Sequence, residues 1–273
     1  MILLVASSKD PASMNITKQI LENYPFEPRK RDFKDVHVYA FRENEQIKLV
    51  VLNEELVYAQ SVTGFSPALE LIIFLSRHSS EKGIPTLSVH APGNFGEACL
   101  GGISRKLSVA PANAMKVALK TMAQLVKEKN LAYKVSYECT HHGPSLDKPA
   151  MFVELGSTLK QWTDTEAAKV VAQAAMEAAL NFREREAQIA IGVGGPHYNE
   201  KFTRIALESN IAFGHIIPKY AIPEVNGEIL HQCVQKTLEK VKLALLDWKG
   251  IRGEDKQRLI ETLEKLNLKI QKV

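Results

Sequence analysis

The sequence predicts an α/β protein built on a mixed, largely parallel central sheet that is flanked by helices. Three observations support this prediction. Short apolar runs alternate with segments of helical apolar spacing along almost all of the 273 residues. The first run, residues 2–6, is apolar throughout, as expected for a strand buried on both faces. Hydrophobic residues make up 45% and charged residues 24%, which suits a sizeable core, and we expect a single domain over residues 1–273.

The first elements after this strand are predicted to be a helix and a hairpin. A polar loop leads into a helix over residues 11–23, where Pro11 in the first turn costs no hydrogen bond. Residues 36–41 and 47–52 are β-prone runs on either side of a polar loop, which predicts two strands joined as a hairpin.

The next part of the chain is predicted to form a helix, a strand and a long loop. Residues 67–78 are rich in large apolar side chains, and Ser66 before them is a candidate N-cap, so we expect a buried helix there. Residues 84–89 form the next strand. The glycine-containing loop over residues 95–111 is long enough to suggest a functional role.

The same alternation continues to the end of the chain. Thr163 and Glu166 have the spacing of a capping box and predict the start of an alanine-rich helix. The remaining strands are predicted over residues 133–137, 150–155, 188–193, 211–217 and 243–246, and the helices over residues 113–129, 163–182, 199–209, 228–241 and 254–267.

Composition says more about the cellular compartment of the protein than about its function. The net charge of +4 permits a polyanionic partner without requiring one, because 31 acidic residues offset most of the 35 basic ones. Three cysteines without a paired spacing suit a reducing, cytoplasmic compartment. The N-terminal apolar run is too short for a signal peptide, and no run is long enough for a membrane helix.

Reactive side chains are concentrated in the stretch Glu138-Cys139-Thr140-His141-His142-Gly143-Pro144, which follows the strand over residues 133–137. A turn at the end of a strand is a common place for ligand sites in α/β sheets. A carboxylate and two imidazoles can serve as metal ligands or proton carriers. The alternative is a strand end with one capping and one solvated histidine, and Cys139 is better explained as a buried strand residue than as a nucleophile.

Histidines recur at similar positions elsewhere in the chain. His90 and His197 also follow predicted strands and stand beside Pro-Gly or Gly-Pro turns, as His141 and His142 do. Because strand ends of a parallel sheet share one edge, these four side chains are expected to converge. Each histidine taken alone is equally consistent with an ordinary hydrogen-bonded residue. The H-E-x-x-H zinc motif and the G-x-S-x-G nucleophile elbow are both missing from the sequence.

Several ordered blocks resemble the archaeal and plant-type D-aminoacyl-tRNA deacylase family, over essentially the whole chain. The resemblance implies hydrolysis of the ester between a D-amino acid and the tRNA 3′ end by a monomer that requires zinc. It also implies a phosphorylase/hydrolase-like fold related to peptidyl-tRNA hydrolase. The blocks are Ala6-Ser7-Ser8-Lys9-Asp10-Pro11-Ala12-Ser13, His90-Ala91-Pro92-Gly93-Asn94, Cys139-Thr140-His141-His142-Gly143-Pro144, Gly192-Val193-Gly194-Gly195-Pro196-His197-Tyr198, and the segment from Phe213-Gly214-His215 to Tyr220.

This chemistry suggests a role for each candidate residue. Zn²⁺ held by histidines would acidify water and polarise the ester carbonyl. The candidate zinc ligands are His90, His141, His142 and His197, and the candidate catalytic residues are His142, His141 and Glu138. The candidate substrate-binding residues are Ser7, Ser8, Lys9, Arg105 and Lys106 for phosphates, and Gly93, Asn94, Gly194 and Gly195 for an oxyanion or the terminal phosphate.

Two other functions remain open from the sequence. A metal-free nucleoside phosphorylase or hydrolase would use the histidines to bind substrate. A tRNA-binding protein without catalysis would keep the phosphate contacts alone. If the protein is a deacylase, the rigid turns Pro92-Gly93 and Gly195-Pro196 are expected to wall the pocket and exclude the side chains of L-amino acids. The side chains of D-amino acids would then point into solvent, so the enzyme is expected to accept many of them.

Overall fold

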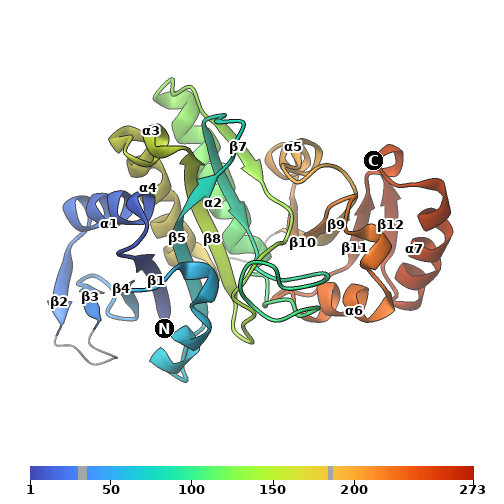
Figure 1. Cartoon of the computed structure of the whole chain (residues 1–273), viewed down its shortest axis with the longest axis horizontal. Helices are drawn as coiled ribbons and strands as arrows, with labels where there is room; N and C mark the ends of the chain where they lie inside the picture. The colour runs from blue at the N-terminus through green and yellow to red at the C-terminus, as the bar shows by residue number, and fades with distance from the viewer. Residues whose placement is uncertain (30–35, 184–186) are drawn as a thin grey trace.

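The chain folds around two β-sheets of different size (Figure 1). The computed structural model describes residues 1–29, 36–183 and 187–273. The larger sheet has eight strands in the order β2-β3-β4-β1-β5-β8-β6-β7, and the smaller sheet has four in the order β10-β9-β11-β12. In these described residues seven of the ten strand pairings are parallel, which confirms the predicted mixed, largely parallel α/β fold.

The elements alternate along the chain as the apolar pattern predicts. The strands are β1 (Ile2–Ser7), β2 (Phe26–Arg29), β3 (His37–Phe41), β4 (Ile47–Leu52), β5 (Leu71–Ser79), β6 (Thr86–His90), β7 (Lys134–Tyr137), β8 (Ala150–Ser157), β9 (Gln188–Val193), β10 (Ile211–Ile217), β11 (Leu243–Leu246) and β12 (Lys269–Lys272). The helices are α1 (Pro11–Asn23), α2 (Ala112–Glu128), α3 (Leu159–Trp162), α4 (Thr165–Asn181), α5 (Glu200–Glu208), α6 (Gly227–Gln235) and α7 (Gly253–Lys265), with 3-10 turns η1 (Leu56–Tyr58), η2 (Gln60–Phe65), η3 (Ile222–Glu224) and η4 (Trp248–Gly250).

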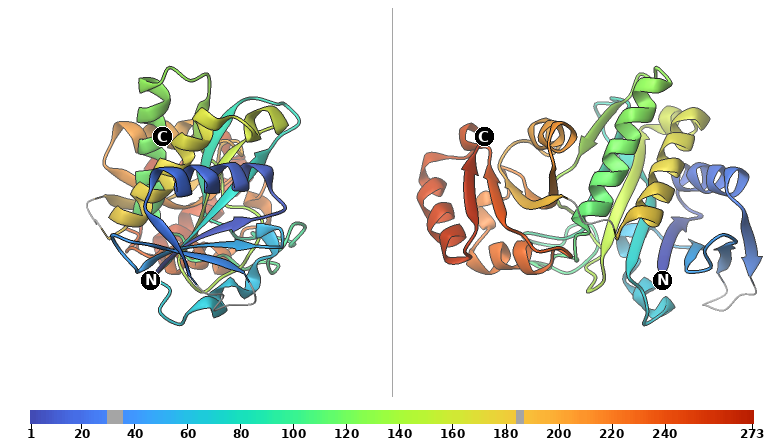
Figure 2. Two further views of the ribbon diagram at one scale, coloured as in Figure 1. Left: turned by 90° about the vertical axis from the view of Figure 1, so that its left-hand side faces the viewer. Right: turned by 180° about the vertical axis from the view of Figure 1, so that it is seen from behind.

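Helices α1, α2 and α4 lie side by side on one face of the larger sheet (Figure 2). The buried face of α4 is made mostly of alanine, which lets the helix approach its neighbours closely. The apolar core beneath these helices continues through α2 and α5 to Phe213 and Leu243 of the smaller sheet. Among the described residues, no helix combines the length and the apolar character needed to cross a membrane.

The predicted helix over residues 67–78 is wrong, because this segment is the central strand β5 between β1 and β8. Its first side chains, Leu71 to Leu75, are all buried with exposed fractions of 0%. A strand covered on both faces is apolar at every position, so the pattern has neither the helical nor the strand period. The consequence for function is that His78 lies in a strand rather than at a helix end.

Smaller corrections concern boundaries. The predicted capping box at Thr163 is wrong, because α4 begins at Thr165 and Asp164 caps it by accepting hydrogen bonds from the backbone N–H groups of Glu166 and Ala167. Helix α6 ends at Gln235 instead of reaching residue 241, and the short strands β2 and β12 were not predicted. The predicted helix α1 and the hairpin of β3 and β4 are confirmed.

The site does not lie along one common carboxyl edge of the sheet, as the sequence suggested. Strand β6 runs antiparallel to β8, so His90 at the end of β6 stands opposite Phe152 within β8. Strand β7 is parallel to β6 and therefore delivers Glu138 and the following histidines to the same place. The turn after β9 joins them through an antiparallel bridge between Glu138 and Tyr198.

Candidate active site

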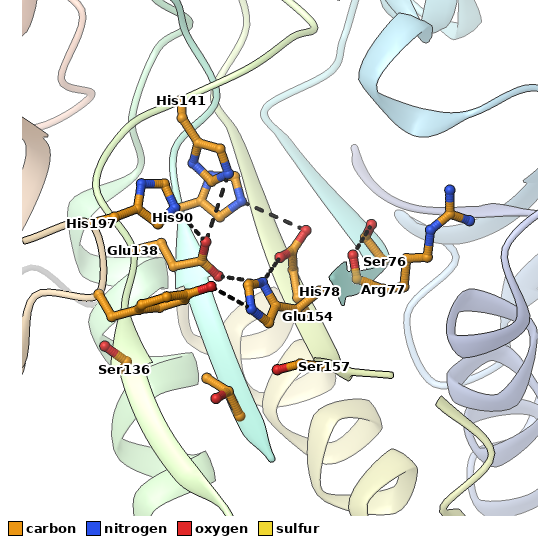
Figure 3. Close-up of polar contacts among 12 residues, drawn as sticks. Ser76, Arg77, His78, His90, Ser136, Glu138, His141, Glu154, Ser157 and His197 are labelled. Carbon is orange, nitrogen blue, oxygen red and sulfur yellow. Dashed lines mark hydrogen bonds and ion pairs between the residues drawn. The ribbon is translucent and has the colours of Figure 1, made fainter. Parts of the chain in front are cut away.

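A cleft of about 570 Å³, here called the main cleft, opens at the meeting point of β5, β8, the turn after β7 and the turn after β9 (Figure 3). Its lining consists of Asp10, Glu55, Leu56, Val57, Tyr58, Ser76, Arg77, His78, Ser79, Leu100, Glu138, His141, His142, Glu154, His197 and Tyr198. Asp10 reaches it as the N-cap of α1, where one carboxylate oxygen accepts from the backbone of Ser13 and the other from the backbone of Arg77.

The four histidines predicted to converge form one group, here called the histidine cluster (His90, His141, His142 and His197). The ring centroids of His90 and His141 are 4.2 Å apart, as are those of His141 and His142, and the centroids of His141 and His197 are 4.5 Å apart. His142 has a φ of +42°, a left-handed backbone conformation that is uncommon outside glycine and recurs at functional sites.

Three members of the cluster share one hydrogen-bonding arrangement. The Nδ1 atoms of His90, His141 and His142 each face a backbone carbonyl, at 3.3, 2.9 and 2.7 Å, respectively. When Nδ1 carries the proton and donates it to the carbonyl, the lone pair of each ring lies on Nε2. In the described structure the Nε2 atom of His90 is buried and has no hydrogen-bond partner. The backbone contacts fix the orientation of the three rings. Carboxylates lie near two of the Nε2 atoms, with Glu154 Oε1 3.7 Å from that of His90 and Glu138 Oε2 3.7 Å from that of His141.

A buried charge network lies beneath the cluster (Figure 3). Nδ1 of His78 lies 3.1 Å from Glu138 Oε1 and 3.5 Å from Glu154 Oε2, and Nε2 lies 2.9 Å from the Tyr198 hydroxyl. Glu138 and Glu154 are only 2% and 3% exposed, so each carboxylate depends on protein partners for its charge balance. The second oxygen of Glu138 accepts from Nε2 of His197 at 2.9 Å.

Electrostatics divide the histidines into two types. Burial alone would lower the pKa of His78, but the carboxylates of Glu138 and Glu154 raise it to about 11. Burial would raise the pKa of Glu138, yet the neighbouring His78 and His197 hold it well below its ordinary value. Burial and the adjacent His90 lower the pKa of His142 to about 4. Burial and the neighbouring His90 also hold the pKa of His141 well below its ordinary value. Burial alone would lower the pKa of His90, but the carboxylate of Glu154 raises it. The network therefore combines ionised carboxylates and protonated His78 with neutral imidazoles at His141 and His142 at neutral pH.

Comparison with known proteins identifies the family. A sequence model of the D-aminoacyl-tRNA deacylase family matches residues 65–271. The D-aminoacyl-tRNA deacylase of Pyrococcus furiosus is 39% identical and that of Thermococcus kodakarensis 37% identical, each over 98% of this chain and 98% of its own. The chain belongs to the D-aminoacyl-tRNA deacylase family. It is therefore an enzyme that hydrolyses the ester bond of D-aminoacyl-tRNA.

A solved structure agrees with the deacylase fold over the whole chain. The crystal structure of a conserved protein of unknown function superposes with a TM-score of 0.90 at 32% identity, covering 100% of this chain and 95% of that chain. The D-aminoacyl-tRNA deacylase of Methanosarcina mazei is 37% identical over 99% of this chain and 92% of its own.

The deacylase has donor sets that suit a metal ion. One side-chain nitrogen from each of His90, His141 and His142 lies within 4.8 Å of the others. His197, the fourth predicted ligand, groups instead with Glu138 and His141. Three imidazoles with fixed rings match the ligand chemistry of Zn²⁺. The observation that favours a ligand here is the buried Nε2 of His90, which has no hydrogen-bond partner although Glu154 Oε1 lies 3.7 Å away.

A second cleft of about 480 Å³, here called the side cleft, adjoins the main cleft. His141 and His142 line both clefts and so stand between them. The side cleft is lined by Gly93, Asn94, Phe95, Gly96, Glu97, Cys99, Thr140, His141, His142, Tyr220, Ala221 and Glu224. Gly93 and Asn94, both predicted to bind substrate, lie here. The N–H of Gly93 is engaged with the carbonyl of His142, and the Asn94 amide donates to carbonyls of its own loop.

The other predicted substrate-binding residues lie outside the lining of the two clefts. Ser7, Ser8 and Lys9 precede Asp10, and the hydroxyls of Ser7 and Ser8 are bound to Glu54 and Asn53. Arg105 donates to the carbonyl of Glu224, and Lys106 pairs with Asp147.

Of the two turns expected to wall the pocket, one contributes to a cleft lining and the other does not. The turn at Pro92-Gly93 reaches the side cleft through Gly93. Gly194, Gly195 and Pro196 belong to the lining of neither cleft, and the N–H of Gly194 donates to the carbonyl of Ile217. Pro196 instead lines a separate groove beside β7.

Sequence reasoning missed His78, Glu154 and Tyr198. His78 was overlooked because its strand was taken for a helix. Glu154 did carry a signal, since it is the one charged residue in the otherwise apolar run Ala150–Ser157, and a carboxylate buried within a central strand needs a partner. Tyr198 follows His197 directly, and nothing in the sequence distinguishes it from an ordinary turn residue.

Proposed function

We propose that the main cleft is where the deacylase cleaves the ester between a D-amino acid and the terminal ribose of tRNA. The observation that carries the proposal is that His141, His142 and His197 of the histidine cluster line a cleft open to solvent, with the buried carboxylate of Glu138 beside His141 and His197. Ester hydrolysis needs an oriented water, a stabilised carbonyl oxygen and a proton for the departing 3′-oxygen, and these residues can provide each of them.

The zinc site within this proposal consists of His90, His141 and His142. When bound there, Zn²⁺ would supply Lewis acidity for the carbonyl and for water. Their hydrogen bonds to backbone carbonyls keep the rings oriented, and the low pKa of His142 keeps its lone pair free at neutral pH. His141, which lies next to Glu138 as well, connects the zinc ligands to the charge network.

Proton handling in this proposal falls to Glu138 and His197. Glu138 is too buried to meet substrate directly, so we assign it the role of a positioning residue that fixes the ring of His197. Nδ1 of His197 lies 3.1 Å from the hydroxyl of Tyr220, which is 60% exposed in the side cleft, so a proton can reach the ring from solvent at that atom. His197 itself lines the main cleft, so its ring can pass a proton to the leaving 3′-oxygen there.

Two experiments test this function. Hydrolysis of D-tyrosyl-tRNA, L-tyrosyl-tRNA and glycyl-tRNA should be compared at equal enzyme concentration. We expect cleavage of the D-tyrosyl and glycyl esters and little cleavage of the L-tyrosyl ester, and equal cleavage of both tyrosyl esters would refute chiral selection. D-aspartyl-tRNA should be cleaved like D-tyrosyl-tRNA if side-chain specificity is broad.

The second experiment measures the metal directly. Elemental analysis of the purified wild-type protein and of His90→Ala is expected to show zinc in the former and its loss in the latter. A wild-type protein that holds no zinc and hydrolyses D-tyrosyl-tRNA unchanged in the presence of chelator would refute the zinc site and favour activation of water by the RNA 2′-hydroxyl. We further propose that the enzyme works as a monomer in the cytoplasm, which size-exclusion chromatography and cell fractionation would check.

A further inference from the structure

The chemistry of the substrate limits how it can occupy the two clefts. The ester joins the amino acid to the ribose of the terminal nucleotide, so the terminal base lies only one sugar away from the reacting carbon. Both the main cleft and the side cleft contain His141 and His142. If cleavage takes place at these histidines, the nucleoside and the amino acid occupy opposite sides of them, and the structure must indicate which side takes which part.

Charge distinguishes the two clefts. Among the described residues that line them, Arg77 of the main cleft is the one lysine or arginine, and its side chain is 30% exposed beside Glu55. The side cleft contains the exposed carboxylates of Glu97 and Glu224. The nucleoside is preceded by a phosphate, whereas the amino acid carries an ammonium group. The main cleft also contains carboxylates, but those of Asp10, Glu138 and Glu154 are at most 3% exposed and that of Glu55 pairs with Arg77. The side cleft thus offers exposed negative charge and no lysine or arginine, which suits the ammonium group, whereas the main cleft offers phosphate a guanidinium.

The main cleft also has an apolar rim made of Tyr58 and Leu100, whose exposed fractions are 55% and 48%. Tyr58 ends the 3-10 turn η1, and the loop that carries Leu100 packs against it. A Cβ added to Gly101 would meet the Tyr58 ring at 3.3 Å and the Val57 carbonyl oxygen at 2.0 Å. The carbonyl of Leu100 accepts from the N–H of Gly143, which ties the rim to the turn that holds His142.

Nothing in the fold requires an aromatic ring at Tyr58. Over the described parts of the chain, its side chain makes no hydrogen bond and no ring contact. Tyr220 of the side cleft differs, because its hydroxyl meets His197 and its ring stacks on that imidazole with 6.4 Å between centroids. An exposed and unengaged aromatic face beside an RNA-processing cleft is the kind of platform on which single-stranded bases stack.

We propose that Tyr58 and Leu100 form a stacking platform for the terminal nucleobase of tRNA, so that the main cleft receives the nucleoside and the side cleft receives the amino acid. This assignment rests on the proposed function of the histidine cluster. It makes Tyr58 a residue that binds the part of the substrate shared by all tRNAs, separate from the residues that select the amino acid.

The kinetic test uses Tyr58→Ala, Tyr58→Phe and Leu159→Ala. Leu159 is 62% exposed, lies outside both cleft linings and is the matched control for losing an exposed apolar side chain. Loss of one stacking contact should lower kcat/KM for D-tyrosyl-tRNA about 5-fold to 150-fold in Tyr58→Ala. Tyr58→Phe keeps the ring and should stay near wild type, as should Leu159→Ala. The factor for Tyr58→Ala should be the same with D-alanyl-tRNA, because the base is common to both substrates.

A binding measurement decides the same question without catalysis. The probe is a short single-stranded RNA that ends in 2-aminopurine in place of the terminal adenine and carries D-tyrosine through a non-hydrolysable amide. Stacking should quench its fluorescence on wild type and Tyr58→Phe and leave it unquenched on Tyr58→Ala. Unchanged quenching and kcat/KM in Tyr58→Ala would overturn the platform, and so would a kinetic loss that depends on the amino acid. A wild-type enzyme that quenches the probe but hydrolyses no D-aminoacyl-tRNA would contradict the proposed function and leave the platform supported.

Discussion

Replacing His78 by glutamine tests whether the buried charge network is held together by this one cation. His78 stands between Glu138 and Glu154, with Nδ1 within 3.1 and 3.5 Å of their oxygens. Glutamine preserves hydrogen-bonding capacity but removes the charge, so two carboxylates that are at most 3% exposed lose their shared partner. Removing one member of a buried ion pair costs about 3–5 kcal/mol of unfolding free energy. For a chain of this size the melting temperature should fall on the order of 10 °C.

The pH dependence gives this prediction a distinct signature. The pKa of His78 is raised from 6.5 to about 11, so its contribution to stability is complete below pH 6.5 and is lost as the pH rises towards 11. The pKa of Glu138 is depressed, so its contribution is present above the ordinary carboxyl range and is lost as the pH falls below it. The stability difference between wild type and His78→Gln should therefore be largest near pH 5–6.5 and decrease on either side.

The assay is urea unfolding followed by circular dichroism at pH 4, 6 and 9. His37→Gln serves as the control, because His37 is exposed on β3 and its loss should change the unfolding free energy by less than about 0.5 kcal/mol. If His78→Gln is as stable as His37→Gln at pH 6, or if its deficit keeps growing from pH 6 to pH 9, the charge network is not organised around His78.

Three further predictions concern the cap of α4, the loop that carries the cluster and the RNA contacts. Asp164→Ala should lower the unfolding free energy by about 1 kcal/mol through loss of the helix cap and leave the deacylation rate unchanged. Thermal melting tests the loss of stability, and an activity assay tests the unchanged rate. Thr140→Val removes the partner of the buried Nδ1 of His215 and should cost about 1–3 kcal/mol in a urea titration, whereas an unchanged midpoint would mean that this link is dispensable. Binding of tRNA should weaken with salt, with a log–log slope of roughly 0.7 to 0.9 per neutralised phosphate. A flat salt dependence would indicate that the enzyme contacts only the terminal nucleotide and the amino acid.

The sequence predicted the alternation of strands and helices well because most strands are short apolar runs between polar or glycine- and proline-containing turns. Helix α1 has apolar residues at helical spacing, and strands β9 and β10 are apolar runs of six and seven residues that are buried at nearly every position. The predicted bounds of all three agree with the structure to within a residue. Strand β5 is also covered on both faces and carries no period, but its nine-residue length and the Ser66-Pro67 pair before it favoured a helix. The short edge strands β2 and β12 depend on their neighbours more than on their own apolar content.

The predicted site was half complete for a related reason. His90, His141, His142 and His197 mark themselves by standing at strand ends beside glycine and proline, and they do converge. The reason for convergence was different from the one expected, because β6 runs antiparallel to β8. The partners beneath them, His78 and Glu154, lie within strands, and only the tertiary pairing of β5 with β8 reveals that they meet.

In the proposed function the ester is cleaved at the histidine cluster. The direct test is single-turnover hydrolysis of D-tyrosyl-tRNA by wild type, His142→Ala and His231→Ala, where His231 is an exposed histidine of α6. His142 lies in a turn and contributes little to the apolar core, so both variants should unfold near the wild-type midpoint. We predict that His142→Ala lowers the rate by at least about 100-fold while His231→Ala leaves it unchanged. A folded His142→Ala protein that hydrolyses D-tyrosyl-tRNA at the wild-type rate would contradict the account.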